Sequence, residues 1–299
     1  MSLTKRSIAT LAVMAMGALT VTGCAQNTEA GAAQDASPAP KVSKDTKLAA
    51  LVPASIRSRG VLKIATSPNY PPNEYIDSNG KITGWSVELT DAVAHKLGLK
   101  PDWVHSGFDQ ILSGLGTNTY DMGDSSFTDT KEREQTVDFV TYFQAGTQWA
   151  SRKGHPVDPD NACGLRVAGQ PDTVQLLDDL PARSKKCVAE GKKPIKIQGY
   201  ADQAAATEAV ILGKADATLG DSPVVAYGVK KSSGKLQLDG SVYDSAPYGY
   251  PVPKGSKLAQ AVKAALQALI ADGTYGKILQ RWGVDGGAIS QPKIDDAQS

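Results

Sequence analysis

Short apolar runs alternate with helix-like segments along most of this chain, and this alternation restricts its fold more than any other feature. Val61 to Thr66, VLKIAT, suits a buried strand, and the proline-rich residues that follow cannot continue a sheet. Val87 to Leu97 places its apolar residues mainly on one helical face, with Gly98 as a stop. A strand near Pro101 to His105 and a helix over Phe108 to Leu115 come next. This order predicts an α/β fold with a mostly parallel sheet, whose ligand loops lie at the carboxyl ends of the strands.

The same alternation stops and then restarts. Asp138 to Arg152 is expected to be one extended crossing, after which Leu165 to Ala168 begins a second series and a helix follows from about Thr173. The restart predicts a second α/β lobe. The remaining expected elements are strands at 194–198 and 217–220, helices at 201–212 and 222–230, an extended segment at 241–253, and helices near 257–272 and 274–282.

The amino-terminal residues have the pattern of a secretory signal. In Met1 to Gly23, Lys5 and Arg6 precede an uncharged run that is too short to span a bilayer comfortably. Val21 to Cys24 resembles a bacterial lipobox, which implies cleavage before Cys24 and a diacylglyceryl group on its thiol. A plain secretory signal and an uncleaved anchor are the alternatives. Residues 24–47 are small and polar, so we expect a lipidated, flexible tether on the outer face of a membrane.

The other two cysteines are expected to pair. With Cys24 used by the lipid, Cys163 and Cys187 remain, and an oxidising exterior favours a disulfide between them. A loop of this size would stabilise the fold by about 3 kcal/mol in the chain-entropy model. Two free buried thiols are the alternative. We expect no metal, because none of the histidines has ligand spacing with a cysteine: His95, His105 and His155.

Charge and motifs exclude several classes of partner. The 32 basic and 31 acidic residues nearly balance and are scattered, and aromatic residues are sparse, so nucleic-acid binding is not expected. The chain has no G-x-S-x-G sequence and no phosphate loop, so no cofactor is expected.

The segment Gly123 to Phe139, GDSSFTDTKEREQTVDF, holds the most distinctive candidate site. Small hydroxyl residues are followed by a charged turn that should open a helix, with Asp129 or Thr130 as its cap. Backbone N–H groups and hydroxyls would point one way, and Arg133 adds a planar fork of donors suited to a carboxylate. The segment therefore predicts a carboxylate-binding loop. The alternative is a surface arginine within a helix-opening run of charges.

In this order, the motifs resemble the amino-acid-binding family of bacterial solute-binding proteins, the extracytoplasmic receptors of ABC importers. The resemblance covers roughly 59–284 and is carried by VLKIATSPNYPPNEY, GWSVELTDAVAHKLG, TDTKEREQTVDF, GKADATLGDSPVVAY, PYGYPVPKGS and LIADGTYGKILQRWG. It implies a two-lobed periplasmic-binding-protein-like fold of type II, whose lobes close over one amino acid. Two crossing strands would join the lobes, near 139–151 and 243–253.

The resemblance also implies domain boundaries. We expect a signal peptide at 1–23, a tether at 24–47, a discontinuous first lobe at 48–145 and 247–290, a second lobe at 146–246 and a tail at 291–299. A monomer working with ABC permease subunits is the implied assembly.

By resemblance, Arg133 occupies the place of the carboxylate-binding arginine. Thr128 and Ser126 match the loop that touches the backbone groups of the ligand, and Asp221 matches the carboxylate for the α-ammonium group. Asp221 could also cap the helix that begins at Ser222, which is compatible with that role.

Three further residues are matched in the same way. Tyr70 and Phe108 match aromatics that flank the bound side chain, although isolated aromatics are more often core residues. Thr173 would open a second-lobe helix whose N–H groups reach the carboxylate only when the lobes close.

Several residues depart from the family pattern and affect specificity. Ser67 stands where many members carry an aspartate, and Asp172 takes a place usually given to glycine. An extra anion at Asp172 would oppose a carboxylate unless it caps the helix or meets a cation. The expected determinants of pocket polarity are Asn73, Trp85, Gln144, Gln170 and Asp172. Ser67 and Gln170 complete the set of residues expected to bind the ligand.

Two other functions remain open. Dehydratases acting on amino-acid-like cyclohexadienols share this fold, and such an enzyme would need a general acid, for which Glu74 and Asp172 are the candidates. A sensor or adhesion module could use the same cleft to report a ligand to a membrane partner. We expect a transport receptor for a polar amino acid or close derivative, and not an enzyme.

Overall fold

The computed structural model describes residues 38–298, which belong to one compact unit. The expected signal peptide, the lipidated Cys24 and most of the expected tether lie outside these residues. The tether was expected to end at Lys47, but this residue lies inside helix α1 (Thr46–Ala49). Asp45 caps this helix, and its side chain accepts hydrogen bonds from two backbone N–H groups. No helix within residues 38–298 is long and apolar enough to cross a membrane.

The first sheet is parallel, as expected. Its central strand β1 (Val61–Thr66) pairs with β5 (Lys100–His105) on one side and β6 (Met122–Gly123) on the other. Thr66 pairs with His105, so the loops that leave these strands emerge at one edge. The carboxyl-edge position of the Gly123 loop is therefore confirmed.

A small antiparallel sheet follows β1, which the sequence did not predict. Strands β2 (Asn69–Tyr70), β3 (Glu74–Ile76) and β4 (Ile82–Thr83) form it, and Tyr70 pairs with Glu74. Pro68 lies between β1 and β2, and Pro71 and Pro72 lie in the turn between β2 and β3, so no ladder hydrogen bond is lost.

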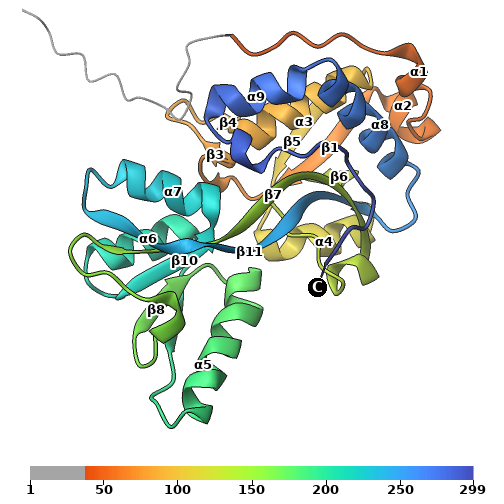
Figure 1. The fold of residues 1–299 in the computed structure, drawn as a ribbon. Coiled ribbons are helices and arrows are strands. Elements are labelled where there is room, and N and C mark those ends of the chain that lie inside the picture. Colours follow the sequence, from red (N-terminus) through yellow and green to blue (C-terminus); the bar gives the residue numbers. More distant parts are fainter. Residues whose placement is uncertain (1–37, 299) are drawn as a thin grey trace, which may run out of the picture. The chain divides into compact units, whose positions relative to one another are not determined.

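Two long strands join this region to the second sheet. Strand β7 (Val137–Arg152) runs antiparallel to β11 (Leu236–Pro253) from Val137 opposite Pro253 to Arg152 opposite Leu236. The far half of β7 also pairs with β10 (Ala217–Asp221), and β8 (Arg166–Gly169) and β9 (Lys196–Gly199) complete the order β11-β7-β10-β8-β9. Figure 1 shows β7 and β11 crossing together between the two sets of elements.

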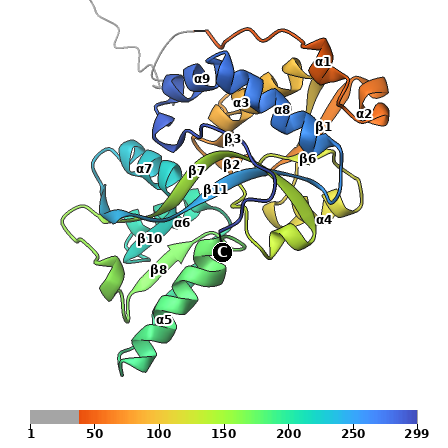
Figure 2. The same ribbon diagram turned by 45° about the vertical axis from the view of Figure 1, so that its right-hand side comes forward.

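The helices divide between the two sheets. Figures 1 and 2 place α3, α8 and α9 together beside β1, whereas α5, α6 and α7 accompany β8 and β10. The largest core cluster joins α3, α8 and α9 to β1, to the first half of β7 and to the last residues of β11. The remaining α-helices and the short helices have these bounds: α2 Ala54–Arg59, α3 Trp85–Lys96, α4 Phe108–Gly116, η1 Arg133–Gln135, η2 Pro159–Asn161, α5 Leu180–Ala189, α6 Gln203–Ile211, α7 Ser222–Lys231, α8 Leu258–Ala271, α9 Thr274–Trp282 and η4 Asp285–Gly287.

Two expected helices differ from the structure. The turn over Asp129 to Glu134 does not open an α-helix; it forms only the 3-10 turn η1, because the chain must enter β7 two residues after η1 ends. The helix expected from Thr173 begins as the π-helical turn η3 (Gln175–Asp179) before α5. Pro181 has no N–H to donate, so a regular α-helical ladder cannot run through this junction.

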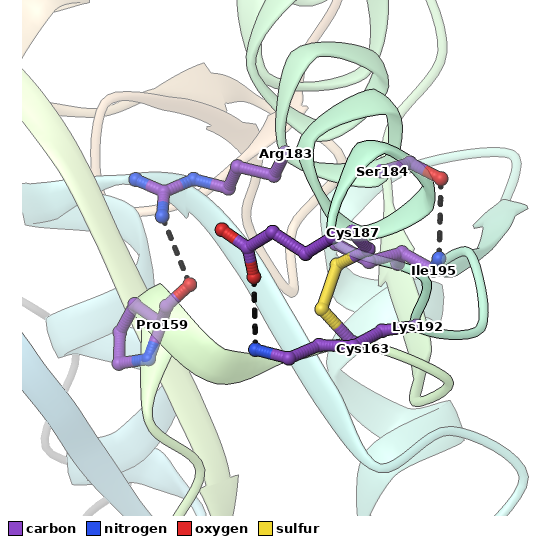
Figure 3. The surroundings of a disulfide bond; sticks show 8 residues. Pro159, Cys163, Arg183, Ser184, Cys187, Lys192 and Ile195 are labelled. Atoms are coloured by element: carbon purple, nitrogen blue, oxygen red, sulfur yellow. Dashed lines mark hydrogen bonds and ion pairs between the residues drawn. A yellow bond between two sulfur atoms is a disulfide. The ribbon is translucent and has the colours of Figure 1, made fainter.

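The disulfide between Cys163 and Cys187 is confirmed. It ties the loop after η2 to helix α5, and Figure 3 shows two further links between neighbouring segments. Arg183 Nη1 donates to the carbonyl of Pro159 at 2.9 Å, and the N–H of Ile195 donates to Ser184 Oγ at 3.1 Å.

Candidate ligand-binding site

A small cavity lies among residues from the first-sheet and second-sheet regions. Eight of the nine residues expected to bind ligand line it: Tyr70, Phe108, Ser126, Thr128, Arg133, Gln170, Thr173 and Asp221. The ninth, Ser67, does not line it. Ser67 is buried behind the wall, where its N–H donates to Ser125 Oγ at 3.1 Å.

Arg133 is held at the start of η1 by contacts on both sides. Its Nη1 donates to the carbonyl of Thr128 and its Nη2 to the carbonyl of Asp172, each at 2.9 Å. Its guanidinium carbon lies 5.8 Å from the Phe108 ring centroid and 5.5 Å from that of Phe127. Burial lowers the pKa of the guanidinium, but an arginine remains cationic at any physiological pH.

Asp221 ends β10 and places a buried carboxylate in the same cavity. Its Oδ2 accepts from the Tyr70 hydroxyl at 2.9 Å, and its Oδ1 accepts from Gln175 Nε2 at 2.8 Å. The side chain makes no cap bond to helix α7, so the capping alternative is not realised by the carboxylate. Burial raises the pKa of Asp221, and its hydrogen bonds oppose that rise.

Glu74 contributes a second carboxylate, for which sequence reasoning considered only a catalytic role. It is fully buried yet lines the cavity. Its Oε2 accepts from the hydroxyls of Ser86 and Ser126, each at 2.9 Å, whereas its Oε1 has no hydrogen-bond partner among the described residues. Burial first, and then the nearby Asp124 carboxylate, raise the pKa of Glu74 well above its ordinary value.

The position of Glu74 follows from close packing between β3 and α3. Gly84 precedes α3 with φ at +139°, and a Cβ there would lie 1.9 Å from the carbonyl oxygen of Asn73. Only glycine allows this approach. The approach brings the Ser86 hydroxyl and the Trp85 indole into hydrogen bonds with β3 and the residue before it.

The aromatic residues expected to flank a ligand side chain are brought to the cavity. The Tyr70 hydroxyl donates a hydrogen bond to Asp221, and Phe108 stacks on Phe127 with ring centroids 4.4 Å apart. Phe108 also lies beside Arg133, so its ring supports the guanidinium as well as the cavity wall.

The residues around Thr173 form a tight turn directly before the helical residues, which begin at Val174. Thr173 Oγ1 donates to the carbonyl of Gln170 at 2.7 Å. Asp172 has a positive φ of 62°, a conformation that suits the glycine expected here. Asp172 does not line the cavity, and its carbonyl accepts from Arg133.

The other expected polarity determinants lie outside the cavity lining, apart from Gln170. Asn73 and Trp85 are fully buried, and the Trp85 indole donates to Asn73 Oδ1 at 2.7 Å. Asn73 Nδ2 donates in turn to Ser126 Oγ at 2.9 Å, so these residues orient Ser126. Gln144 does not line the cavity.

Sequence reasoning missed several lining residues: Asn69, Ser125, Val174 and Gln175. Each lies within two positions of a residue that was expected, so proximity along the chain was the available signal. Gln175 is the most informative, since its amide links Asp221 to Thr147 Oγ1 at 3.1 Å. Among residues 38–298, no group of three or more histidine, cysteine, aspartate or glutamate side chains could hold a metal ion.

The model of the bacterial extracellular solute-binding proteins, family 3, matches residues 62–285. The chain belongs to this family. The solute-binding protein is 38% identical over 299 residues to the arginine-binding protein ArgT of Corynebacterium glutamicum, an alignment that covers 98% of this chain and 96% of that protein. The resemblance expected from the sequence, including the two-lobed α/β fold class, is therefore confirmed.

Solved structures give the same result. The arginine-, lysine-, histidine-binding protein ArtJ from Geobacillus stearothermophilus matches with a TM-score of 0.66 and 31% identity, over 74% of this solute-binding protein and 94% of that chain. The ancestral amino acid-binding protein AncCDT-1, a precursor of cyclohexadienyl dehydratase, matches with a TM-score of 0.66 and 31% identity, over 76% and 97%. The fold thus lies close to an enzyme lineage, while the family match supports solute binding.

Proposed function

We propose that this solute-binding protein captures a basic amino acid, arginine in particular, for an ABC importer. The observation that carries the proposal is the unpartnered Oε1 of Glu74, a buried carboxylate oxygen in a residue that lines the candidate cavity. A buried carboxylate oxygen needs a donor, and Oε1 has none among the described residues.

The charges of the cavity favour a ligand with two cations and one anion. Arg133 is suited to the ligand carboxylate and Asp221 to the α-ammonium group, which together account for a zwitterion. Glu74 remains, and a cationic side chain would match its carboxylate. A guanidinium offers several N–H donors in one plane, which suits a carboxylate oxygen beside two serine hydroxyls.

The relatives support this choice of ligand. ArgT is named an arginine-binding protein, and ArtJ is named for arginine, lysine and histidine. In the proposed complex, Tyr70 and Phe108 pack along the side chain, while Ser126, Thr128, Gln170 and Thr173 surround the backbone groups of the ligand.

The proposal extends to the assembly. The two lobes, 48–145 with 247–290 and 146–246, would close over the ligand, and a monomer would deliver it to the permease subunits. A diacylglyceryl group on Cys24 would hold the receptor at the extracytoplasmic face of the cell membrane.

Catalysis is not part of the proposal. Asp172, one of the two residues considered as a general acid, does not line the cavity. Glu74 is left, and the proposal assigns its carboxylate to the ligand cation.

Isothermal titration calorimetry with arginine, lysine, citrulline and glutamate tests the ligand. Citrulline is the neutral counterpart of arginine, so we expect it to bind at least about tenfold more weakly. Glu74→Gln should remove most of this preference. Glu132→Gln removes the same negative charge at an exposed residue outside the cavity lining, and this variant should keep the preference for arginine over citrulline. Tightest binding of glutamate, or an unchanged preference in Glu74→Gln, would reject the proposal.

A further inference from the structure

The last described residues form an additional edge on the crossing strand β7. They lie beyond the region matched by the family model, which ends at residue 285. Ile294 is bridged antiparallel to Val140; the N–H of Thr141 donates to the carbonyl of Lys293 at 2.9 Å, and the N–H of Asp295 to that of Phe139 at 3.1 Å. In Figures 1 and 2 the dark-blue end of the chain, marked C, follows this course past β7. We call residues 293–297 the terminal segment.

Side chains strengthen this pairing from both directions. Phe139 donates its N–H to Asp295 Oδ1 at 2.8 Å, and Lys293 donates its N–H to Thr141 Oγ1 at 2.8 Å. Four hydrogen bonds thus fix the terminal segment to two alternate residues of β7, Phe139 and Thr141. A segment held in this way is an ordered part of the fold.

The terminal segment also forms hydrogen bonds with both ends of the loop that carries Arg133, at Asp129 and at Glu134. The N–H of Asp296 donates to Asp129 Oδ2 at 2.9 Å, and the N–H of Ala297 donates to Glu134 Oε1 at 3.0 Å. Asp129 is only 1% exposed, so its carboxylate depends on such donors in place of water. The consecutive N–H groups of Asp296 and Ala297 therefore hold residues on either side of Arg133.

Several carboxylates surround Asp129, so its carboxyl group depends on the N–H donor from the terminal segment. Asp295 and Glu134 both raise the pKa of the Asp129 carboxyl, after the larger effect of its burial. Lys254 offsets part of this negative charge, because its Nζ lies 2.8 Å from Asp138 and 3.4 Å from Asp295. Removing the terminal segment would leave the buried Asp129 carboxylate facing Glu134 without its N–H donor.

We propose that the terminal segment is a positioning element for the ligand carboxylate: it fixes the Asp129–Glu134 loop so that Arg133 faces the cavity. The inference rests on the proposed role of Arg133. It assigns a ligand-binding contribution to a stretch that touches no ligand and lies outside the family-matched region.

Truncation after Pro292 tests the inference, with the dissociation constant for arginine as the readout. We expect the constant to rise by about tenfold, the effect of losing one or two hydrogen bonds that hold a ligand-binding group. In an Arg133→Ala background the same truncation should change the constant by less than about twofold, since the group being positioned is gone. A purely structural role would weaken binding equally in both backgrounds and would overturn the inference.

Point variants cover the case in which the truncated protein does not fold. Asp129→Ala removes the acceptor for the terminal segment and should weaken arginine binding, whereas Asp129→Asn keeps an acceptor oxygen and should restore most of the affinity. Equal affinities for Asp129→Ala and the unmodified protein would overturn the inference. If the unmodified protein does not bind arginine, the proposed ligand fails instead, and the truncation is measured with the amino acid that binds.

Discussion

At the scale of single residues, the candidate site is defined by three ionisable groups, one guanidinium and two carboxyl groups. Arg133 and Asp221 were both expected from their motifs, and both line the cavity. Glu74 adds an uncompensated carboxylate, and its chemistry depends on the residues packed around it. Two predictions belong to this scale.

The first concerns the ligand carboxylate. Arg133→Ala should weaken arginine binding by roughly two to three orders of magnitude, because losing one partner of a desolvated charge pair costs about 2–5 kcal/mol. Lys131→Ala is the matched control, since Lys131 is a neighbouring cation that is exposed and does not line the cavity. Calorimetry measures both. Similar losses in the two variants would show that general charge, and not the Arg133 contact, governs binding.

The second concerns pH. Burial and Asp124 raise the pKa of Glu74, so the free protein favours the protonated form below that raised pKa, whereas a ligand cation favours the carboxylate. Arginine affinity should therefore rise as the pH rises through the raised pKa, by at most about tenfold per pH unit, and fall as the pH drops.

Proton release provides the measurement. Titrations in buffers of different ionisation enthalpy should show a proton leaving on binding, and Glu74→Gln should abolish it. The other groups that face Glu74 are Asp124 and Asp221, with Tyr70 and Tyr142 close by. A release that persists in Glu74→Gln would assign the proton to Asp124 or Asp221.

At the scale of elements, short irregular segments position the site. The turn η1 holds Arg133, and the Thr130 hydroxyl accepts the Arg133 N–H at 3.3 Å, so the expected capping residue acts on a 3-10 turn. The π-turn η3 places Gln175 against Asp221. Regular helices would place these side chains differently.

The disulfide gives the prediction at this scale. Replacing both Cys163 and Cys187 by serine should lower the free energy of unfolding by about 3 kcal/mol, because the unfolded chain gains conformational freedom. Neither cysteine lines the cavity, so arginine affinity should stay within about twofold. Urea denaturation and calorimetry measure the two quantities. A large loss of affinity with intact folding would link α5 to the ligand site.

At the scale of the whole molecule, hydrogen bonds of Tyr70 and Arg133 connect the first-sheet region to the second-sheet region around the cavity. Tyr70, in β2, donates to Asp221 at the end of β10, and Arg133 donates to the carbonyl of Asp172 after β8. These contacts join groups that a ligand would also touch, so they should favour the closed arrangement before ligand arrives.

Tyr70→Phe tests this coupling. The variant loses the bond to Asp221 and should populate a more open arrangement without ligand, while saturating arginine should restore closure. Small-angle X-ray scattering should record a larger radius of gyration for the ligand-free variant only. Identical radii for the variant and the unmodified protein, with and without arginine, would contradict this view of closure.

The sequence by itself determined the regular elements and the residue types that meet at the candidate site. Apolar periodicity located β1, α3, α4 and the long crossing strands because a buried face must repeat with the period of its element. The motif around Arg133 was recognisable because its hydroxyl residues and its arginine adjoin one another along the chain. The disulfide followed from the number of cysteines.

Only the tertiary structure decided what depends on contacts between distant residues. Glu74 was visible in the sequence, but its unpartnered oxygen results from packing against α3 and the loop after β6. Ser67 was expected in the cavity and lies behind its wall, because burial depends on neighbours that no local pattern encodes. The terminal segment shows the same limit, since its hydrogen bonds join residues more than 150 positions apart, and no periodicity along the chain records such a pairing.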